Sequence, residues 1–298
     1  MDWIIFALLA PILWAGCNII DKFLLTKYFK NAFDYQLWIV LTDAPIIVFF
    51  LMFFPLSFSY PGFLLGIILG IMDVTALFIY NKAMLVEEVS RVIPLSYIDV
   101  LFILPMAYFF FGEVLKIQNY IGIILLLMGA ILISLKVINS KKRILSPALK
   151  FVLILALLWA ILGTLEKYTL GLIEKLSIIF WMVVGTVIGA SPLFLFQRLR
   201  SRVYSKIKNM NWIILLLTII VQLLAYSAFF VYLTAMSEGL LSLVVGISLI
   251  QPFIVFLFTT TLTLLLPKVI KEKIDRSTLF LKFIAICLIF VGAWLVMI

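Results

Sequence analysis

Long apolar stretches follow one another along this chain, and only short polar segments separate them. A helix needs about 20 apolar residues to cross the hydrocarbon core of a bilayer. A stretch such as 121–135 is apolar on every side, whereas the strands of a membrane barrel alternate apolar and polar positions. The pattern therefore predicts an all-α integral membrane protein. Its ten transmembrane helices are expected at 3–21, 35–54, 62–82, 91–111, 119–138, 149–166, 177–197, 212–234, 240–266 and 278–297.

The chain contains an internal repeat. The ten residues LWAGCNIIDK at 13–22 recur as LWAILGTLEK at 158–167, and YNKAM at 80–84 recurs as YLTAM at 232–236. These matches divide the chain into two five-helix copies, 1–140 and 147–298. Because each copy has an odd number of helices, the second must be inverted relative to the first, as in many secondary transporters.

Charge indicates the orientation. Of the 23 Lys and Arg residues, 20 lie in or beside the loops that follow odd-numbered helices. Basic loops favour the cytoplasmic side, so these loops are expected in the cytoplasm and both termini outside, in a multi-pass protein of the cell membrane. The net charge of +9 is then a topology signal beside anionic lipid, not a sign of nucleic-acid binding. The first apolar stretch lacks the features of a cleaved signal peptide and is interpreted as the first helix.

Three acidic residues lie deep inside predicted spans. Asp43, Asp73 and Asp99 are each eight or nine residues from the expected cytoplasmic end, which places them roughly 12–14 Å deep. No Lys, Arg or His lies at this depth. A desolvated carboxylate without a basic partner favours a proton, another cation or a substrate amine. In the alternative interpretation, these groups accept hydrogen bonds from Tyr, Asn or Ser and hold helices together. The absence of central cations argues against anionic substrates.

Other polar and aromatic positions complete a candidate binding site. Amides at four positions could supply neutral hydrogen bonds, and four aromatic residues lie deep enough to contact an amphipathic ligand. The two acidic-basic pairs at the ends of the repeated segment are expected to be equivalent gates at opposite surfaces. The amides are Asn18, Asn81, Gln222 and Gln251, and the aromatic residues are Trp14, Trp159, Tyr97 and Tyr226. The acidic-basic pairs are Asp21 with Lys22 and Glu166 with Lys167.

Taken together, the repeated motifs resemble the EamA-type domains of the drug/metabolite transporter superfamily. The matching features are a Trp and a Lys bracketing the first helix of each copy, Tyr-x-x-Ala at 80–83 and 232–235, Asp99, and Gly112-Glu113. The resemblance implies five plus five helices around a central cavity lined mainly by helices 1, 3, 4, 6, 8 and 9, with helix 2 peripheral. Gln251 departs from the pattern, because it stands where the family has an acid in copy two.

The function expected from these features is alternating-access transport of a small amphipathic metabolite, amino acid or drug that is cationic or zwitterionic. A proton or another cation is the candidate coupling ion. Without histidine, the chain has no catalytic triad or His-containing metal site, and it has no phosphate-binding loop, so we expect neither an enzyme nor a cofactor. A membrane-embedded enzyme or lipid-carrier translocase that uses the intramembrane Asp residues is the alternative, and a receptor or scaffold is a third. Substrate identity, transport direction and oligomeric state are not specified by the sequence.

Overall fold

The computed structural model describes residues 2–134, 148–265 and 276–298, and every regular element among them is helical. In chain order the elements are α1 (Asp2–Phe23), η1 (Leu24–Phe29), α2 (Ala32–Phe53), α3 (Tyr60–Val86), α4 (Val89–Ser96), η2 (Tyr97–Asp99), α5 (Val100–Phe111), α6 (Ile117–Ser134), α7 (Leu149–Thr169), α8 (Lys175–Ala190), η3 (Ser191–Leu195), α9 (Gln197–Lys208), α10 (Trp212–Glu238), α11 (Leu241–Ser248), α12 (Gln251–Leu265) and α13 (Arg276–Met297).

Eight of the ten predicted segments are helices long and apolar enough to cross a membrane. Within the described residues these spans are Trp3–Phe29, Ala32–Phe53, Tyr60–Val86, Val89–Phe111, Leu149–Thr169, Lys175–Leu195, Trp212–Glu238 and Leu241–Leu265. The predicted segments 119–138 and 278–297 correspond to shorter apolar helices, Ile117–Leu132 and Phe283–Met297, next to residues outside the described ranges.

Two of the spans are interrupted near their middle. The span 89–111 contains the 3₁₀ turn η2 between α4 and α5, and the span 241–265 is broken between Ser248 and Gln251. Pro252 follows the second break, where its missing N–H prevents a helical bond to Ser248. The two breaks are 152 residues apart. This is the same offset that separates the repeated stretches 80–84 and 232–236, so the breaks lie at matching positions of the repeated sequence.

A side-chain cap and two left-handed residues mark where several helices begin and end. The Asn31 side chain caps α2 by accepting hydrogen bonds from the backbone N–H groups of Phe33 (2.8 Å) and Asp34 (3.3 Å). Gly112 ends α5 with a φ of 65°, a left-handed conformation that glycine adopts without steric cost. Lys30 ends η1 in the same region, with a φ of 57°.

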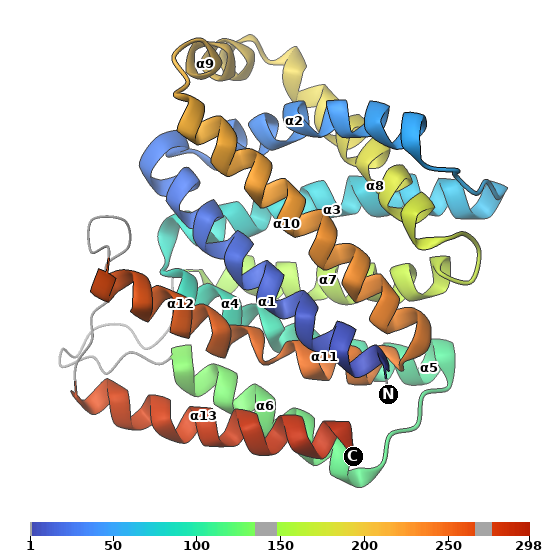
Figure 1. Ribbon diagram of the computed structural model, residues 1–298, viewed down its shortest axis with the longest axis vertical. Helices are drawn as coiled ribbons and strands as arrows, with labels where there is room; N and C mark the ends of the chain where they lie inside the picture. The colour runs from blue at the N-terminus through green and yellow to red at the C-terminus, as the bar shows by residue number, and fades with distance from the viewer. Residues whose placement is uncertain (1, 135–147, 266–275) are drawn as a thin grey trace.

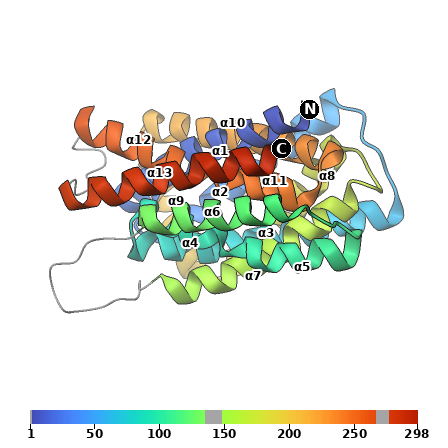
Figure 2. The same cartoon turned by 90° about the horizontal axis from the view of Figure 1, so that it is seen from below.

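The helices of the two halves are interleaved. Figures 1 and 2 both place the N- and C-termini close together and toward one end of the bundle, and Figure 1 shows α9 toward the opposite end. α1 packs along α10, α3 along α7 and α8, and α6 along α13. Consequently, most of the extensive helix contacts join residues before 135 to residues after 148.

Glycine permits the closest of these contacts. A Cβ atom added at Gly70 of α3 would lie 2.0 Å from the carbonyl oxygen of Met182 in α8, and one added at Gly185 would lie 2.2 Å from that of Ile67. These glycines belong to the Gly-x-x-x-Gly sequences 66–70 and 185–189, a pattern typical of close helix packing in membranes.

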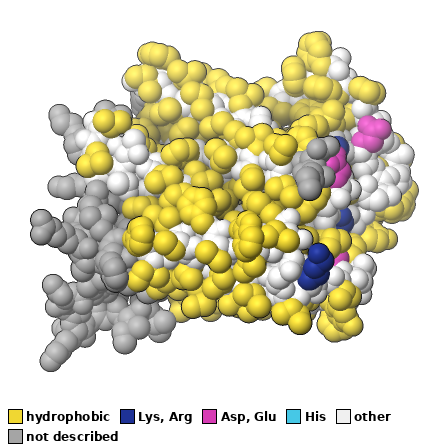
Figure 3. Space-filling view, turned by 60° about the horizontal axis from the view of Figure 1, so that its bottom comes forward, with side chains coloured by type: hydrophobic (Ala, Val, Ile, Leu, Met, Phe, Trp, Pro, Cys, Tyr) yellow, Lys and Arg dark blue, Asp and Glu magenta, His cyan; other side chains and the backbone are white. Residues whose placement is uncertain are grey.

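Much of the surface is apolar. Figure 3 shows a face covered largely by hydrophobic side chains, with few charged groups. Large exposed apolar residues include Phe109, Ile117 and Leu195. A soluble protein would not leave such a surface uncovered, whereas lipid tails cover it without penalty.

The α3–α8 contact gives a direct stability test. We expect Gly70→Ala to lower the free energy of unfolding by about 1–3 kcal/mol, because the new methyl group would meet backbone atoms that cannot move aside. Gly16→Ala is the matched control, because its Cβ would be 3.5 Å from the flexible Leu224 side chain. Thermal unfolding in detergent measures both variants. Equal stability of the two would contradict the packing argument.

Candidate functional site

A cavity of about 340 Å³ lies between the two halves of the chain. The helices expected to line it, α1, α3, α4 with η2, α7, α10 and α11, all contribute side chains. α2 and α8 also contribute, so the expectation that helix 2 is peripheral to the site was wrong. All of the predicted binding residues are on the cavity wall: Trp14, Asn18, Asp43, Asp73, Asn81, Tyr97, Asp99, Trp159, Gln222, Tyr226 and Gln251.

The cavity wall carries five carboxyl groups. They are Asp21, Asp43, Asp73, Asp99 and Glu166, whereas no Lys, Arg or His is among the described residues that line the cavity. Asp99 and Glu166 are each only 7% exposed. Because ionised carboxylates are costly to bury without a counter-charge, this wall favours a cation or bound protons.

Asp43 has hydrogen-bond partners on the other half of the chain. Its Oδ1 atom accepts a hydrogen bond from Tyr226 Oη at 2.7 Å and another from Gln222 Nε2 at 2.8 Å. Gln222 Nε2 also lies 2.8 Å from Thr42 Oγ1. Asp43 thus has the contacts that the helix-joining alternative requires, and they tie α2 to α10.

Asp73, Asp99 and Glu166 differ from Asp43. Among the described residues, no hydrogen bond or ion pair reaches the side chain of Asp73 or Glu166, and Asp99 Oδ1 is buried without a hydrogen-bond partner. Asp73 is close enough to Asp43 and Glu166 for their charges to interact. These three groups are therefore the ones most available to a ligand.

A chain of neutral hydrogen bonds crosses the cavity. Tyr97 Oη donates to Gln251 Oε1 at 2.5 Å, Gln251 Nε2 donates to Asn18 Oδ1 at 2.6 Å, and Asn18 Nδ2 donates to Tyr80 Oη at 2.8 Å. These hydrogen bonds join η2 and α3 to α1 and α12. Tyr97 and Gln251 lie at the two helix interruptions, and both therefore reach the part of the cavity that these hydrogen bonds cross. Asn81 instead donates to Gln36 Oε1 of α2 at 2.8 Å.

Aromatic side chains form two matched pairs. The ring centroids of Trp14 and Tyr232 are 5.1 Å apart, and those of Trp159 and Tyr80 are 6.0 Å apart. Each pair combines the tryptophan of one copy with the tyrosine of the other. All four rings line the cavity, where their faces can attract an organic cation.

The two repeated lysines have equivalent partners. Lys22 Nζ donates to the carbonyl oxygens of Met84 and, at 2.6 Å, Glu87 at the end of α3. Lys167 Nζ donates to those of Met236 and, at 2.8 Å, Gly239 at the end of α10. Each lysine therefore caps the C-terminus of a helix, where carbonyl groups lack helical partners.

The acidic partners of these lysines point elsewhere. Asp21 Oδ1 accepts a hydrogen bond from Tyr35 Oη at 2.5 Å, and both Asp21 and Glu166 line the cavity. The predicted acidic-basic pairs are consequently divided between two places, with the acids on the cavity wall and the bases on helix ends. Their role as gates stays a prediction.

Sequence reasoning omitted several wall residues. Tyr80 and Tyr232 stand in the repeated Tyr-x-x-Ala stretches, so the repeat itself could have indicated them as partners for the repeated tryptophans. Tyr35 and Gln36 carry no such signal, because they lie near the start of α2, in a stretch without a recognised repeat.

Comparison with known proteins identifies the class. The model of the EamA-like transporter family, which is part of the drug/metabolite transporter superfamily, matches residues 1–135, so this part of the chain is similar to that family. Together with the eight apolar spans of the described residues, this match indicates a multi-pass membrane protein. No curated protein sequence matches the chain.

A solved structure shares the fold over the full length. It is described only as "Crystal structure of protein", is 14% identical, and aligns with a TM-score of 0.62 over 100% of this chain and 99% of its own. At this identity the likeness concerns the fold alone.

Proposed function

We propose that the chain is an alternating-access secondary transporter of a small amphipathic cation or zwitterion, such as an amine metabolite, amino acid or drug. The observation that carries the proposal is a cavity between the two halves whose wall has five carboxyl groups and, among the described residues, no basic one. A cationic substrate or bound protons would supply the missing positive charge.

Alternating access needs two equivalent pathways, and the proposal includes two inverted five-helix copies at 1–140 and 147–298. The lysine caps support it, since Lys22 and Lys167 have matched carbonyl partners 152 residues apart. The exchanged Trp–Tyr pairs and the two helix interruptions support it in the same way. An enzyme would need one active site and no such duplication.

The proposal also assigns sides and a coupling ion. The end that carries α9 and the other basic loops is cytoplasmic, and both termini are outside, according to the positive-inside rule. A reporter that is active only outside the cytoplasm should be active when fused after Ile298; activity of a cytoplasmic reporter there would reverse the orientation. Asp73 and Asp99 carry the substrate amine or the coupling proton, because neither is neutralised by a basic neighbour.

Neutral substitutions test the two aspartates. A thermal-shift panel of amines and amino acids at two pH values first selects a ligand, since binding raises the stability of the folded state. We then expect Asp99→Asn and Asp73→Asn each to weaken binding about tenfold or more, as loss of a charged hydrogen bond does, and to abolish pH-driven transport in proteoliposomes. Asn keeps the shape and removes the charge, so folding should persist.

Glu238→Gln is the control, because it removes a carboxylate from an exposed position outside the cavity wall. Transport that keeps its rate and pH dependence in both aspartate variants would reject the proposal and favour the helix-joining alternative.

A further inference from the structure

The helix α9 lies outside the spans and carries an unusual concentration of basic residues. Its sequence QRLRSRVYSKIK has five Lys or Arg residues in 12 and no acidic residue. Figure 1 shows α9 end-on, whereas the flanking α8 and α10 run across the view, so α9 lies crosswise to the spans that it connects. A helix with this orientation at the end of a membrane bundle lies parallel to the bilayer surface.

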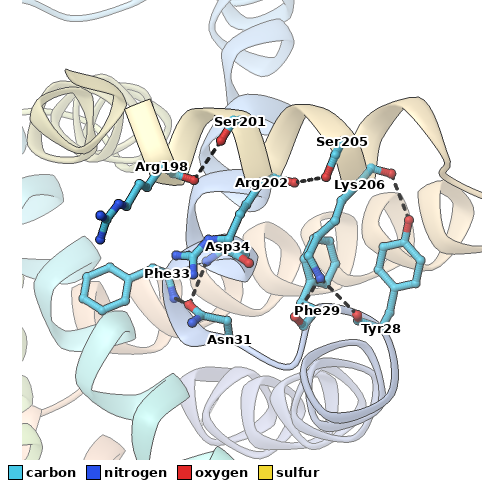
Figure 4. Close-up of polar contacts among 10 residues, drawn as sticks. All are labelled: Tyr28, Phe29, Asn31, Phe33, Asp34, Arg198, Ser201, Arg202, Ser205 and Lys206. Carbon is cyan, nitrogen blue, oxygen red and sulfur yellow. Dashed lines mark hydrogen bonds and ion pairs between the residues drawn. The ribbon is translucent and has the colours of Figure 1, made fainter. Parts of the chain in front are cut away.

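One face of α9 is fixed to the first half of the chain. Arg202 Nη2 lies 3.3 Å from Asp34 Oδ1, and the Asp34 side chain is only 3% exposed. Lys206 Nζ donates to the carbonyl oxygen of Phe29 at 2.8 Å, and Tyr28 Oη donates to that of Lys206 at 3.0 Å (Figure 4). These contacts, with the burial of Val203, hold α9 against the turn between α1 and α2.

The docked residues follow helical spacing. Leu199, Arg202, Val203 and Lys206 are separated by three, one and three positions, which places them on one side of α9. Burial lowers the pKa of Lys206, and the nearby Asp34 carboxylate opposes that effect. These basic groups are therefore already engaged by the protein itself.

The other face of α9 is exposed and amphipathic. Arg200, Tyr204, Ile207 and Lys208 lie at successive helical spacings of four, three and one, and Tyr204 is 68% exposed. Exposed Phe196 and Trp212 flank the helix on either side. Basic groups beside exposed aromatic and aliphatic groups are typical of helices at the level of lipid headgroups.

We propose that this exposed face, defined by Arg200, Tyr204, Ile207 and Lys208, binds the headgroups of anionic phospholipids in the adjacent leaflet. The phosphate and other anionic groups of the lipid contact Arg200 and Lys208, while Tyr204 and Ile207 enter the boundary between headgroups and acyl chains. The contacts of Arg202 and Lys206 with the first half of the chain keep α9 at that depth. Charge complementarity selects an anionic lipid, since α9 carries five basic residues and no acidic one.

Native mass spectrometry of the purified full chain tests the proposal, with phosphatidylglycerol and phosphatidylcholine as the two probes. The wild type should bind phosphatidylglycerol more tightly than phosphatidylcholine, and this preference should fall as salt rises. Arg200→Gln/Lys208→Gln should weaken phosphatidylglycerol binding about fivefold or more, the factor expected for one basic residue near an anionic surface.

Lys27→Gln/Lys82→Gln is the matched control, because it removes two exposed charges from the same end but outside α9. It should weaken phosphatidylglycerol binding less than the α9 double variant does, because these lysines lie outside the exposed face. Equal losses in both double variants, or a wild-type preference that is absent or unaffected by salt, would overturn the proposal. Displacement of phosphatidylglycerol by soluble poly-glutamate at equal charge concentration would assign the surface to an acidic protein segment and would also overturn it. The salt titration uses the wild type, so the test stands even if the α9 variant fails to fold.

Discussion

Burial of carboxyl groups without basic partners is the constraint on which the architecture depends. A charged group in the middle of a membrane is tolerated only where protein or water surrounds it. The cavity between the two halves meets that requirement for Asp73, Asp99 and Glu166, because all of the lining helices except α5 contribute polar or aromatic side chains to its wall. Trp159 and Tyr80 provide ring faces, and the chain from Tyr97 to Tyr80 provides hydrogen bonds that a ligand can share.

The two ends of the bundle are held together by contacts of different chemistry. At the end that carries α9, the Arg202–Asp34 ion pair and the Lys206 contacts join the second half to the first. At the end that carries the termini, the contact is neutral, because the backbone N–H of Ser57 donates to Ser177 Oγ at 2.8 Å. The contact at the α9 end is ionic and the Ser57–Ser177 contact is neutral, so salt would weaken the ionic contact far more than the neutral one. The two ends of the bundle can therefore respond differently to salt.

Much of this organisation was predictable because membrane burial leaves strong signals in a sequence. Apolar length predicted the eight helices that are long and apolar enough to cross a membrane, and the rarity of intramembrane acids pointed to Asp43, Asp73 and Asp99, which share one cavity. The hydrogen bonds of Asp43 could not be predicted, since they depend on the depth at which α2 meets α10. The separation of Asp21 from Lys22 was also missed, because adjacent helical residues point about 100° apart and only the surrounding helices decide which one faces the cavity.

Reciprocal accessibility of the two cavity ends tests the central claim most directly. Gln36 lines the cavity four residues from the start of α2, near the α9 end, and Phe229 lines it far along α10, toward the end with the termini. In a background without Cys17 and Cys287, Gln36→Cys and Phe229→Cys report maleimide labelling rates for the two ends. We predict that any ligand or pH change that raises one rate severalfold lowers the other. Rates that rise and fall together would contradict alternating access through this cavity.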